Sequence, residues 1–203
     1  MKTGLVAGLT GDICAGKSSV SALLKECGAR VWDADAYVRA LFERGDVKNE
    51  VVALCGPGVL DAQGNVDRGA ISRLVFQDSP ALLERLTREI IYPRTGEAIR
   101  QSIAEFRASA DAPLLLVDAP TLFESGSNAL CDRIIWIGAP PDVRERWAMD
   151  NRGWVPGEIA RREARLLPAA QKKARCDAVI ENSGSKEDLQ HNVRQLWKQW
   201  TGS

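Results

Sequence analysis

The sequence predicts an α/β protein in which helices cover both faces of a five-stranded parallel sheet. Five short apolar segments, rich in β-branched residues and mostly without alternation, have the composition of strands that are buried on both faces. These segments are residues 5–9, 29–32, 114–117, 133–137 and 178–180. Longer segments with helical spacing lie between them, and this alternation of strands and helices is typical of a parallel sheet.

The size and composition indicate one domain that binds neither nucleic acid nor membrane. The chain has 203 residues, 45% of them apolar, and 27 basic residues balance 27 acidic ones. A net charge of zero argues against binding of nucleic acid by bulk charge, and no apolar run reaches the roughly 18 residues of a membrane span. Because the N-terminus does not resemble a signal peptide, we expect a cytoplasmic protein, which we take to be a monomer.

Cysteine and histidine usage excludes several kinds of site. The five cysteines are widely separated and form no C-x-x-C pair, so neither a disulfide framework nor a zinc knuckle is expected. His191 is the only histidine of the chain. A histidine-based catalytic triad and a metal site with several histidines are therefore excluded.

Three helices can be located from their spacing and their end signals. The first, residues 17–27, follows a glycine-rich turn. A second begins with Ser79 as N-cap and Pro80 as its first residue, and the pair Tyr92–Pro93 should end or kink it. A third begins at a capping box, Ser185-x-x-Asp188. Its apolar stripe, which we expect to face the core, is Leu189, Val193, Leu196, Trp197 and Trp200.

Two stretches go beyond a minimal α/β sheet. Residues 45–110 contain no convincing strand, which predicts a helical insertion into a core formed by residues 1–44 and 111–203. Residues 141–175, called the lid segment below, are helical, and the part from Arg144 to Arg175 holds nine basic residues and four acidic ones. The lid segment is either a solvated helix pair or a mobile cover over a polyphosphate.

A phosphate-binding motif follows the first predicted strand. The run from Gly11 to Ser18, GDICAGKS, matches G-x-x-x-x-G-K-[ST], and an amphipathic helix comes after it. The glycines let the backbone turn tightly, so that its N–H groups and the helix N-terminus face a polyphosphate. Lys17 would reach the β- and γ-phosphates, and the Ser18 hydroxyl would bind Mg²⁺. The sequence thus predicts a P-loop NTPase fold with ATP bound by Gly11, Cys14, Ala15, Gly16, Lys17, Ser18 and Ser19.

Carboxylates at the ends of two predicted strands face the same edge of the sheet. Asp33-Ala34-Asp35 follows the second strand, and in a kinase one carboxylate would take the proton of the attacking hydroxyl while the other holds Mg²⁺ or a water. On an extended segment the two side chains face the same way. Asp118 ends the third strand, where a second magnesium-supporting carboxylate is common. Capping of a helix or loop remains the alternative for each aspartate.

The phosphate-binding motif by itself does not identify the molecule that accepts the phosphoryl group. A guanine-reading N-K-x-D is absent, which disfavours a GTPase. The loop that begins at Pro120 would line an acceptor pocket. Charge builds up on a transferring phosphoryl group, so an arginine of the lid segment would close over it, and Arg144, Arg146 and Arg152 are the candidates.

Several blocks along nearly the whole chain resemble the dephospho-coenzyme A kinase family. They are GLTG at 8–11 with the P-loop through Ser19, DAD at 33–35, GNVDR at 64–68, Pro93 after Ile90-Ile91, P-x-LFE at 120–124, and AVI-x-N-x-G at 178–184. The resemblance implies ATP-dependent phosphorylation of the 3′-hydroxyl of dephospho-CoA, the last step of coenzyme A synthesis. It also implies a helical insertion on the CoA side and an arginine-bearing lid.

The resemblance also implies a role for single residues. Asp35 matches the general base, Lys17 and Ser18 match the phosphate and magnesium residues, Arg146 is the nearest match to the lid arginine, and Asn182 lies near the adenine of ATP. Residues assigned to the acceptor are Thr10, Asp33, Tyr92, Pro93, Asp118 and Pro120. The chain departs from the family pattern at Asp12 (usually glycine), Tyr92 (histidine), Thr121 (leucine) and Leu166 (glutamine).

Two other functions stay open at this point. One is a P-loop kinase for another small acceptor, such as a nucleoside monophosphate. The other is a regulator that binds ATP and signals to a partner through the lid segment, which the four departures motivate.

Overall fold

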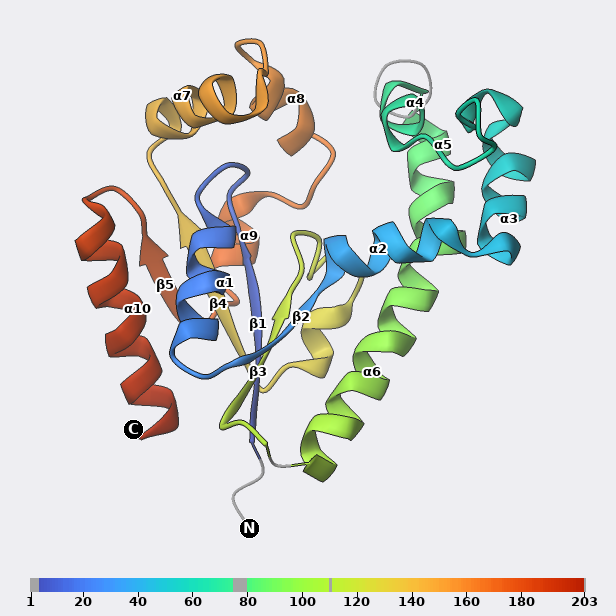
Figure 1. Cartoon of the computed structure of the whole chain (residues 1–203). Helices are drawn as coiled ribbons and strands as arrows, with labels where there is room; N and C mark the ends of the chain where they lie inside the picture. Colours follow the sequence, from blue (N-terminus) through green and yellow to red (C-terminus); the bar gives the residue numbers. More distant parts are fainter. Residues whose placement is uncertain (1–3, 75–79, 110, 203) are drawn as a thin grey trace. The chain divides into compact units, whose positions relative to one another are not determined.

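The structure is a computed structural model that describes residues 4–74, 80–109 and 111–202. The chain forms two compact units, one made of Met1–Asp33 and Ile99–Ser203 and the other of Ala34–Ala98. The first unit contains a five-stranded sheet with the spatial order β2-β3-β1-β4-β5 (Figure 1). The strands are β1 (Leu5–Gly11), β2 (Arg30–Asp33), β3 (Leu114–Asp118), β4 (Arg133–Gly138) and β5 (Ala178–Glu181). All pairs are parallel, so the predicted α/β fold with five parallel strands is confirmed.

The strand register brings the candidate site residues to one edge of the sheet. β1 lies between β3 and β4, and its last residue, Gly11, is opposite Ile137 of β4. The last residues of β2 and β3, Asp33 and Asp118, are opposite each other. Since all strands are parallel, their carboxyl ends share this edge, which is where open α/β sheets bind ligands.

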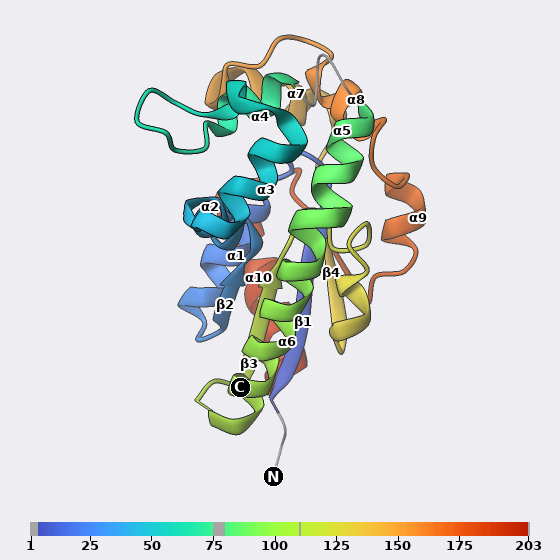
Figure 2. The ribbon, with the colours of Figure 1, turned by 90° about the vertical axis from the view of Figure 1, so that its right-hand side faces the viewer.

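Helices cover the two faces of the sheet, as predicted. Helices α1 (Lys17–Glu26) and α10 (Lys186–Thr201) pack on one face, and the second half of α6 (Tyr92–Ser109) packs on the other (Figures 1 and 2). The strand residues of the first face include Ala7, Leu9, Leu116, Ile135 and Ile137, and the helices add Val20, Leu24, Val193 and Trp197. On the second face Ile99, Ile103 and Phe106 of α6 are buried. Within the described residues, no helix combines the length and the apolar character needed to cross a membrane.

Helix α10 begins and packs as the sequence predicts. The Ser185 hydroxyl accepts a hydrogen bond from the Asp188 backbone N–H at 3.1 Å, and the Asp188 carboxylate accepts one from the Ser185 backbone N–H at 2.9 Å. The hydrogen bond from the Ser185 side chain lowers the pKa of Asp188. The predicted stripe faces the core, with Leu189, Val193, Leu196 and Trp197 buried and Trp200 packed against them.

The second unit is helical and has an apolar core of its own. Its complete elements are α2 (Ala34–Glu43), α3 (Gly45–Cys55), a 3₁₀ turn (Pro57–Val59), α4 (Arg68–Arg73), α5 (Pro80–Arg85) and a π-helix (Leu86–Ile91). Its described residues contain no strand beyond an isolated bridge between Leu60 and Val66. Helix α2 groups with this unit because Leu41 and Phe42 pack against Val47 and Val51 of α3. The helical unit therefore starts at Ala34 rather than at residue 45.

The chain stays helical across Tyr92–Pro93 but changes helix type there. Pro80 is the first residue of α5, as expected, whereas its predicted N-cap, Ser79, lies outside the described residues. The π-helix ends at Ile91, and α6 begins at Tyr92 with Pro93 as its second residue. Proline has no N–H to donate, so the wider π turn before it takes the place of the expected break.

Candidate active site

The P-loop joins β1 to α1, and its path requires glycine at two positions for different reasons. Gly16 has φ 94°, and a Cβ atom there would lie 2.5 Å from Nδ2 of Asn182. Gly11 ends β1, and a Cβ atom there would clash with the Ile137 carbonyl of β4. The predicted role in a tight turn thus fits Gly16, while Gly11 is needed for close packing on β4. Cys14, with φ 60°, is the only described residue other than glycine with a positive φ.

Asn182, the residue after β5 (Ala178–Glu181), holds the P-loop in place. Its buried side chain donates a hydrogen bond from Nδ2 to the Ala15 carbonyl at 3.0 Å, and its backbone N–H donates to the Gly138 carbonyl at 2.7 Å. Asn182 therefore lies beside the P-loop, and its place near the adenine of ATP stays a prediction. Because the amide already holds the loop backbone, Asn182 supports the phosphate site independently of any contact with adenine.

Lys17 and Asp118 form an ion pair at the carboxyl edge of the sheet. Lys17 is the first residue of α1, and its Nζ contacts Oδ1 of Asp118, whose side chain is only 8% exposed. Burial raises the pKa of Asp118, and its interactions with Lys17 and Ser21 act against that rise. Asp118 therefore pairs with the P-loop lysine rather than capping the loop that follows it.

Asp33 and Asp35 do not share an extended segment, so that part of the sequence argument is wrong. Asp33 is the last residue of β2, and Asp35 lies in the first turn of α2, in the second compact unit. Both side chains are exposed. Helix capping remains possible for Asp33, which directly precedes α2, but not for Asp35, which lies inside the helix. The catalytic role of Asp35 stays a prediction.

The lid segment is helical, as predicted, and contacts the P-loop through an arginine. It contains α7 (Pro141–Arg152), α8 (Glu158–Glu163) and α9 (Ala169–Lys173). Arg144 donates a hydrogen bond to the Ile13 carbonyl at 3.2 Å and pairs with Glu163 at 2.6 Å. This anchoring argues against a solvated helix pair.

The three candidate arginines of the lid segment lie in different surroundings. The Arg146 side chain is 63% exposed and faces Asp142 at 3.6 Å. Arg152 lies over the ring of Trp154, 5.1 Å from its centroid. Burial raises the pKa of the Cys14 thiol in the P-loop, and Arg152 and Arg144 act against that rise. The structure thus brings Arg144 and Arg152 toward the P-loop, and the lid role of Arg146 stays a prediction.

The residues assigned to the acceptor lie in two places. Thr10 is fully buried, and its hydroxyl donates a hydrogen bond to the Pro120 carbonyl at 3.0 Å, which ties β1 to the loop after β3. Tyr92 and Pro93 begin α6 within the second unit. The contact of any of these residues with an acceptor stays a prediction, and the Thr10 hydroxyl already has a structural partner.

A buried ion pair that the sequence did not reveal anchors the far end of the lid segment. Oε1 of Glu124, in the loop after β3, accepts hydrogen bonds from Lys172 Nζ at 2.9 Å and from the Leu167 backbone N–H at 3.2 Å. The Lys172 side chain is 3% exposed and lies over Trp136, 5.8 Å from the ring centroid. In the sequence, Glu124 is recognisable as part of the P-x-LFE block and Lys172 only as one of the nine basic residues of the lid segment. Nothing in the sequence indicates that these two residues, 48 positions apart, form a pair.

Replacing Lys172 with methionine should lower the free energy of unfolding by about 3 kcal/mol, because it leaves the Glu124 carboxylate buried without its cation. The neighbouring Lys173 is the matched control, since its side chain is 45% exposed and pairs at the surface with Glu181 at 2.5 Å. Lys173→Met should cost about 1 kcal/mol or less. Urea unfolding followed by circular dichroism measures both, and equal losses would contradict the structural role of the Glu124–Lys172 pair.

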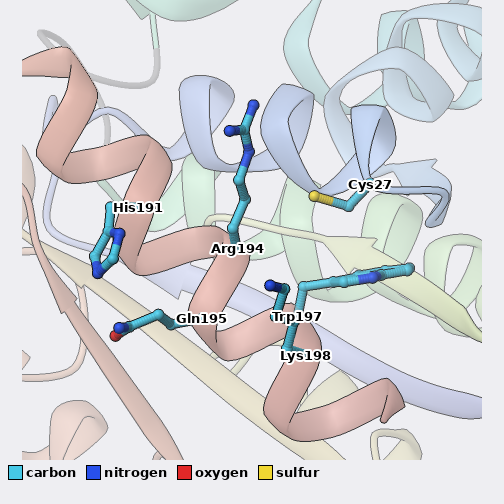
Figure 3. A pocket seen from close by; sticks show the side chains of 6 residues that line it. All are labelled: Cys27, His191, Arg194, Gln195, Trp197 and Lys198. Atoms are coloured by element: carbon cyan, nitrogen blue, oxygen red, sulfur yellow. The ribbon is translucent and has the colours of Figure 1, made fainter. Parts of the chain in front are cut away.

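A cleft of about 500 Å³ lies on another part of the first unit. It is lined by Cys27, His191, Arg194, Gln195, Trp197 and Lys198 (Figure 3). Cys27 follows the last residue of α1, whereas the P-loop precedes the first, so the length of that helix separates the cleft from the phosphate site. In Figure 3, Arg194 points away from His191 and Gln195, so these polar groups do not converge on one ligand.

The P-loop edge offers oxygen ligands suited to Mg²⁺. Ser18, in the first turn of α1, is exposed, and the carboxylates of Asp118 and Asp33 end the adjacent strands. Among the described residues, no group of three or more histidine, cysteine, aspartate or glutamate side chains could hold a metal ion alone. Magnesium in phosphoryl-transfer sites takes one or two protein ligands and the phosphates of the substrate, so these residues fit it.

Comparison with known proteins decides the family. The family model described as dephospho-CoA kinase matches residues 5–188. The chain belongs to the dephospho-CoA kinase family. The dephospho-CoA kinase of Geobacillus kaustophilus is 34% identical over 97% of this chain and 96% of the relative. The crystal structure of TT1252 from Thermus thermophilus is 32% identical, with a TM-score of 0.80 over 99% of this chain and 100% of that one.

A more distant solved structure has the same fold. The dephospho-CoA kinase from Campylobacter jejuni is 18% identical, and its structure aligns with a TM-score of 0.70 over 97% of both chains. The predicted fold is confirmed by these structures, and the resemblance to the dephospho-CoA kinase family is confirmed by the family model and the relatives above 30% identity.

At two positions that depart from the family pattern, Thr121 and Leu166, the backbone rather than the side chain makes the local hydrogen bond. The Thr121 carbonyl accepts a hydrogen bond from the Ser125 N–H at 3.0 Å, and the Leu166 N–H donates to the Glu163 carbonyl at 3.0 Å. Neither bond depends on the side chain, so these replacements leave the local fold intact. Asp12 is different, because it adds a charge to the P-loop itself.

Proposed function

We propose that this protein transfers the γ-phosphoryl group of ATP to the ribose 3′-hydroxyl of dephospho-CoA and so produces coenzyme A. The match to the dephospho-CoA kinase family model over residues 5–188 carries this proposal. The structure supports it with a P-loop whose glycines, lysine and serine are all present and whose lysine faces the ligand edge of the sheet.

ATP binds along the P-loop in this proposal. Backbone N–H groups from Gly11 to Ser19 face the phosphates, and Lys17 exchanges Asp118 for the β- and γ-phosphate oxygens. Mg²⁺ would be held by Ser18, with Asp118 or Asp33 in support. When bound, the ion would neutralise negative charge on the phosphates.

Asp35 acts as general base toward the acceptor. Its carboxylate takes the proton of the ribose 3′-hydroxyl, whose oxygen forms the new bond to the γ-phosphorus while the bond to the β,γ-bridging oxygen breaks, which releases ADP. Thr10, Asp33, Tyr92, Pro93, Asp118 and Pro120 form the acceptor side. An arginine of the lid segment stabilises charge on the transferred group, and closure of the lid segment excludes water.

The division of labour between parts of the chain belongs to the same proposal. The sheet unit carries the ATP site, the helical insertion carries the CoA side of the acceptor, and residues 141–175 form the lid. We further propose that the enzyme works as a cytoplasmic monomer with ATP and dephospho-CoA as its small-molecule substrates.

The test is formation of coenzyme A by the purified protein from dephospho-CoA, ATP and Mg²⁺. We expect turnover that stops when EDTA removes Mg²⁺. A panel with nucleoside monophosphates tests the alternative of a kinase for another small acceptor. Calorimetry with each substrate tests the regulator, which would bind ATP and ignore dephospho-CoA. Binding of ATP without any product from dephospho-CoA would contradict the proposed function.

A further inference from the structure

The P-loop of this chain carries an acidic side chain, Asp12, beside the expected phosphate site. Burial raises the pKa of Asp12, and the nearby carboxylates of Glu163 and Glu181 add to the rise, whereas Arg144 and Lys173 oppose it. A Cβ atom at Gly138, the last residue of β4, would lie 3.3 Å from Oδ2 of Asp12 and 2.9 Å from Oε2 of Glu181. Two carboxylates therefore meet over Gly138, next to the phosphate loop.

Arg144 approaches the same part of the P-loop from α7. Its side chain is 10% exposed, and one terminal nitrogen contacts both the Ile13 carbonyl and the carboxylate of Glu163. Its Nε atom is buried and has no hydrogen-bond partner among the described residues. The hydrogen bond to the Ile13 carbonyl holds the peptide group between Ile13 and Cys14, one residue beyond Asp12, so the guanidinium and the acid act on the same turn of the loop.

The charges in this cluster do not balance. Of the cations that act on Asp12, Arg144 pairs with Glu163 and Lys173 pairs with Glu181, so neither is left to balance the carboxylate of Asp12 itself. Asp12 forms no ion pair within the parts of the chain that the structure describes. A polyphosphate that enters the loop meets this excess negative charge, and partly buried charges are poorly screened by salt. Loss of Arg144 would leave the excess larger.

We infer that Arg144 is a positioning residue that keeps the acidic P-loop able to bind ATP, by holding the Ile13 carbonyl and by compensating the charge of Asp12. This inference rests on the proposed function, because it assumes that the loop binds ATP. It assigns Asp12 and Arg144 to one functional pair, in which the arginine is needed because the loop carries an aspartate. Arg146 is not part of the pair, since its side chain is exposed and lies beside Asp142.

A double-mutant cycle on ATP affinity tests the pair. Calorimetry would measure Mg·ATP binding to the unmodified protein, Arg144→Gln, Asp12→Asn and the double variant. Glutamine removes the charge but keeps a side-chain donor. We expect Arg144→Gln to weaken binding at least about tenfold in the unmodified protein and about threefold or less in the Asp12→Asn background. Arg144→Lys, which restores the charge, should recover part of the loss.

The control is Arg133→Gln, which removes an exposed arginine at the first residue of β4, the end of the strand away from the P-loop, and should change ATP affinity less than about twofold. If Arg144→Gln does not fold, as judged by circular dichroism, Arg144→Met takes its place in the cycle. An equal loss in both backgrounds would overturn the inference, because Arg144 would then act without regard to Asp12. Failure of the unmodified protein to bind ATP would instead overturn the proposed function, so the two failures can be told apart.

Discussion

Replacing Lys17 with alanine is expected to reduce coenzyme A formation about 10³-fold. Lys17 is the cation that the P-loop supplies to the β- and γ-phosphates, and charge on the transferred group peaks in the transition state, so its loss affects turnover more than ground-state affinity. The variant also leaves Asp118, 8% exposed, without its partner. A neighbouring buried carboxylate would then repel the phosphates, which adds to the loss.

Steady-state kinetics with dephospho-CoA at saturation gives kcat and the KM for ATP. Calorimetry then compares the ATP affinity of Lys17→Ala with that of the unmodified protein. Lys25 is the matched control, because it is an exposed lysine in the last turn of the same helix. Lys25→Ala should retain activity within about twofold, as expected of a surface change away from the site. An active Lys17→Ala protein would remove the lysine from the mechanism and with it the assignment of the P-loop as the phosphate site.

The strands and the phosphate loop were predictable because their signals are local. A short run of β-branched residues before GDICAGKS and an amphipathic helix after it occur within about twenty residues of sequence, and the structure places β1, the loop and α1 accordingly. Buried parallel strands carry the same kind of signal wherever they stand in the sheet. Five strands could therefore be found, although no local signal gives their spatial order.

The residues that hold the lid segment were not predictable, because their partners lie far away in the sequence. Arg144 and Ile13 are 131 positions apart, and Glu124 and Lys172 are 48 apart. Composition marks the segment as basic, but only packing shows that Arg144 is buried at the loop while Arg146, two residues later, faces solvent. On a helix these two positions point in different directions, so spacing alone does not rank them.

The prediction that Asp33 and Asp35 face the same way was wrong for a different reason, which concerns local structure. The argument that Asp33 and Asp35 face one way assumed that the strand continues through residue 35. The strand ends at Asp33, and Ala34 begins α2. A change from strand to helix within a few residues is the least reliable part of any assignment from sequence. Helix capping, the alternative role that the sequence leaves open for Asp33, fits a helix that starts at Ala34.

Asp35→Asn is expected to lower kcat by about 10² to 10⁴-fold and to leave ATP affinity within about threefold. The substitution keeps the shape of the side chain and removes only its ability to accept a proton, so it tests base catalysis directly. ATP affinity should persist because the P-loop belongs to the sheet unit, whereas Asp35 lies in the first turn of α2 in the other unit. Steady-state kinetics and calorimetry on the same preparation separate the two effects.

Asp46 provides the matched control for this variant. It is an exposed aspartate in the first turn of α3, the next helix of the same unit, so Asp46→Asn makes the same change in charge at a helix N-terminus. Asp46→Asn should keep kcat within about twofold, which shows that a local effect on the helix does not account for the loss. Asp33→Asn decides between the carboxylates of the triplet, since both side chains are exposed and the two residues are only two positions apart. A large loss of kcat in Asp33→Asn together with normal turnover in Asp35→Asn would move the base to Asp33, within the same unit as Lys17 and Asp118.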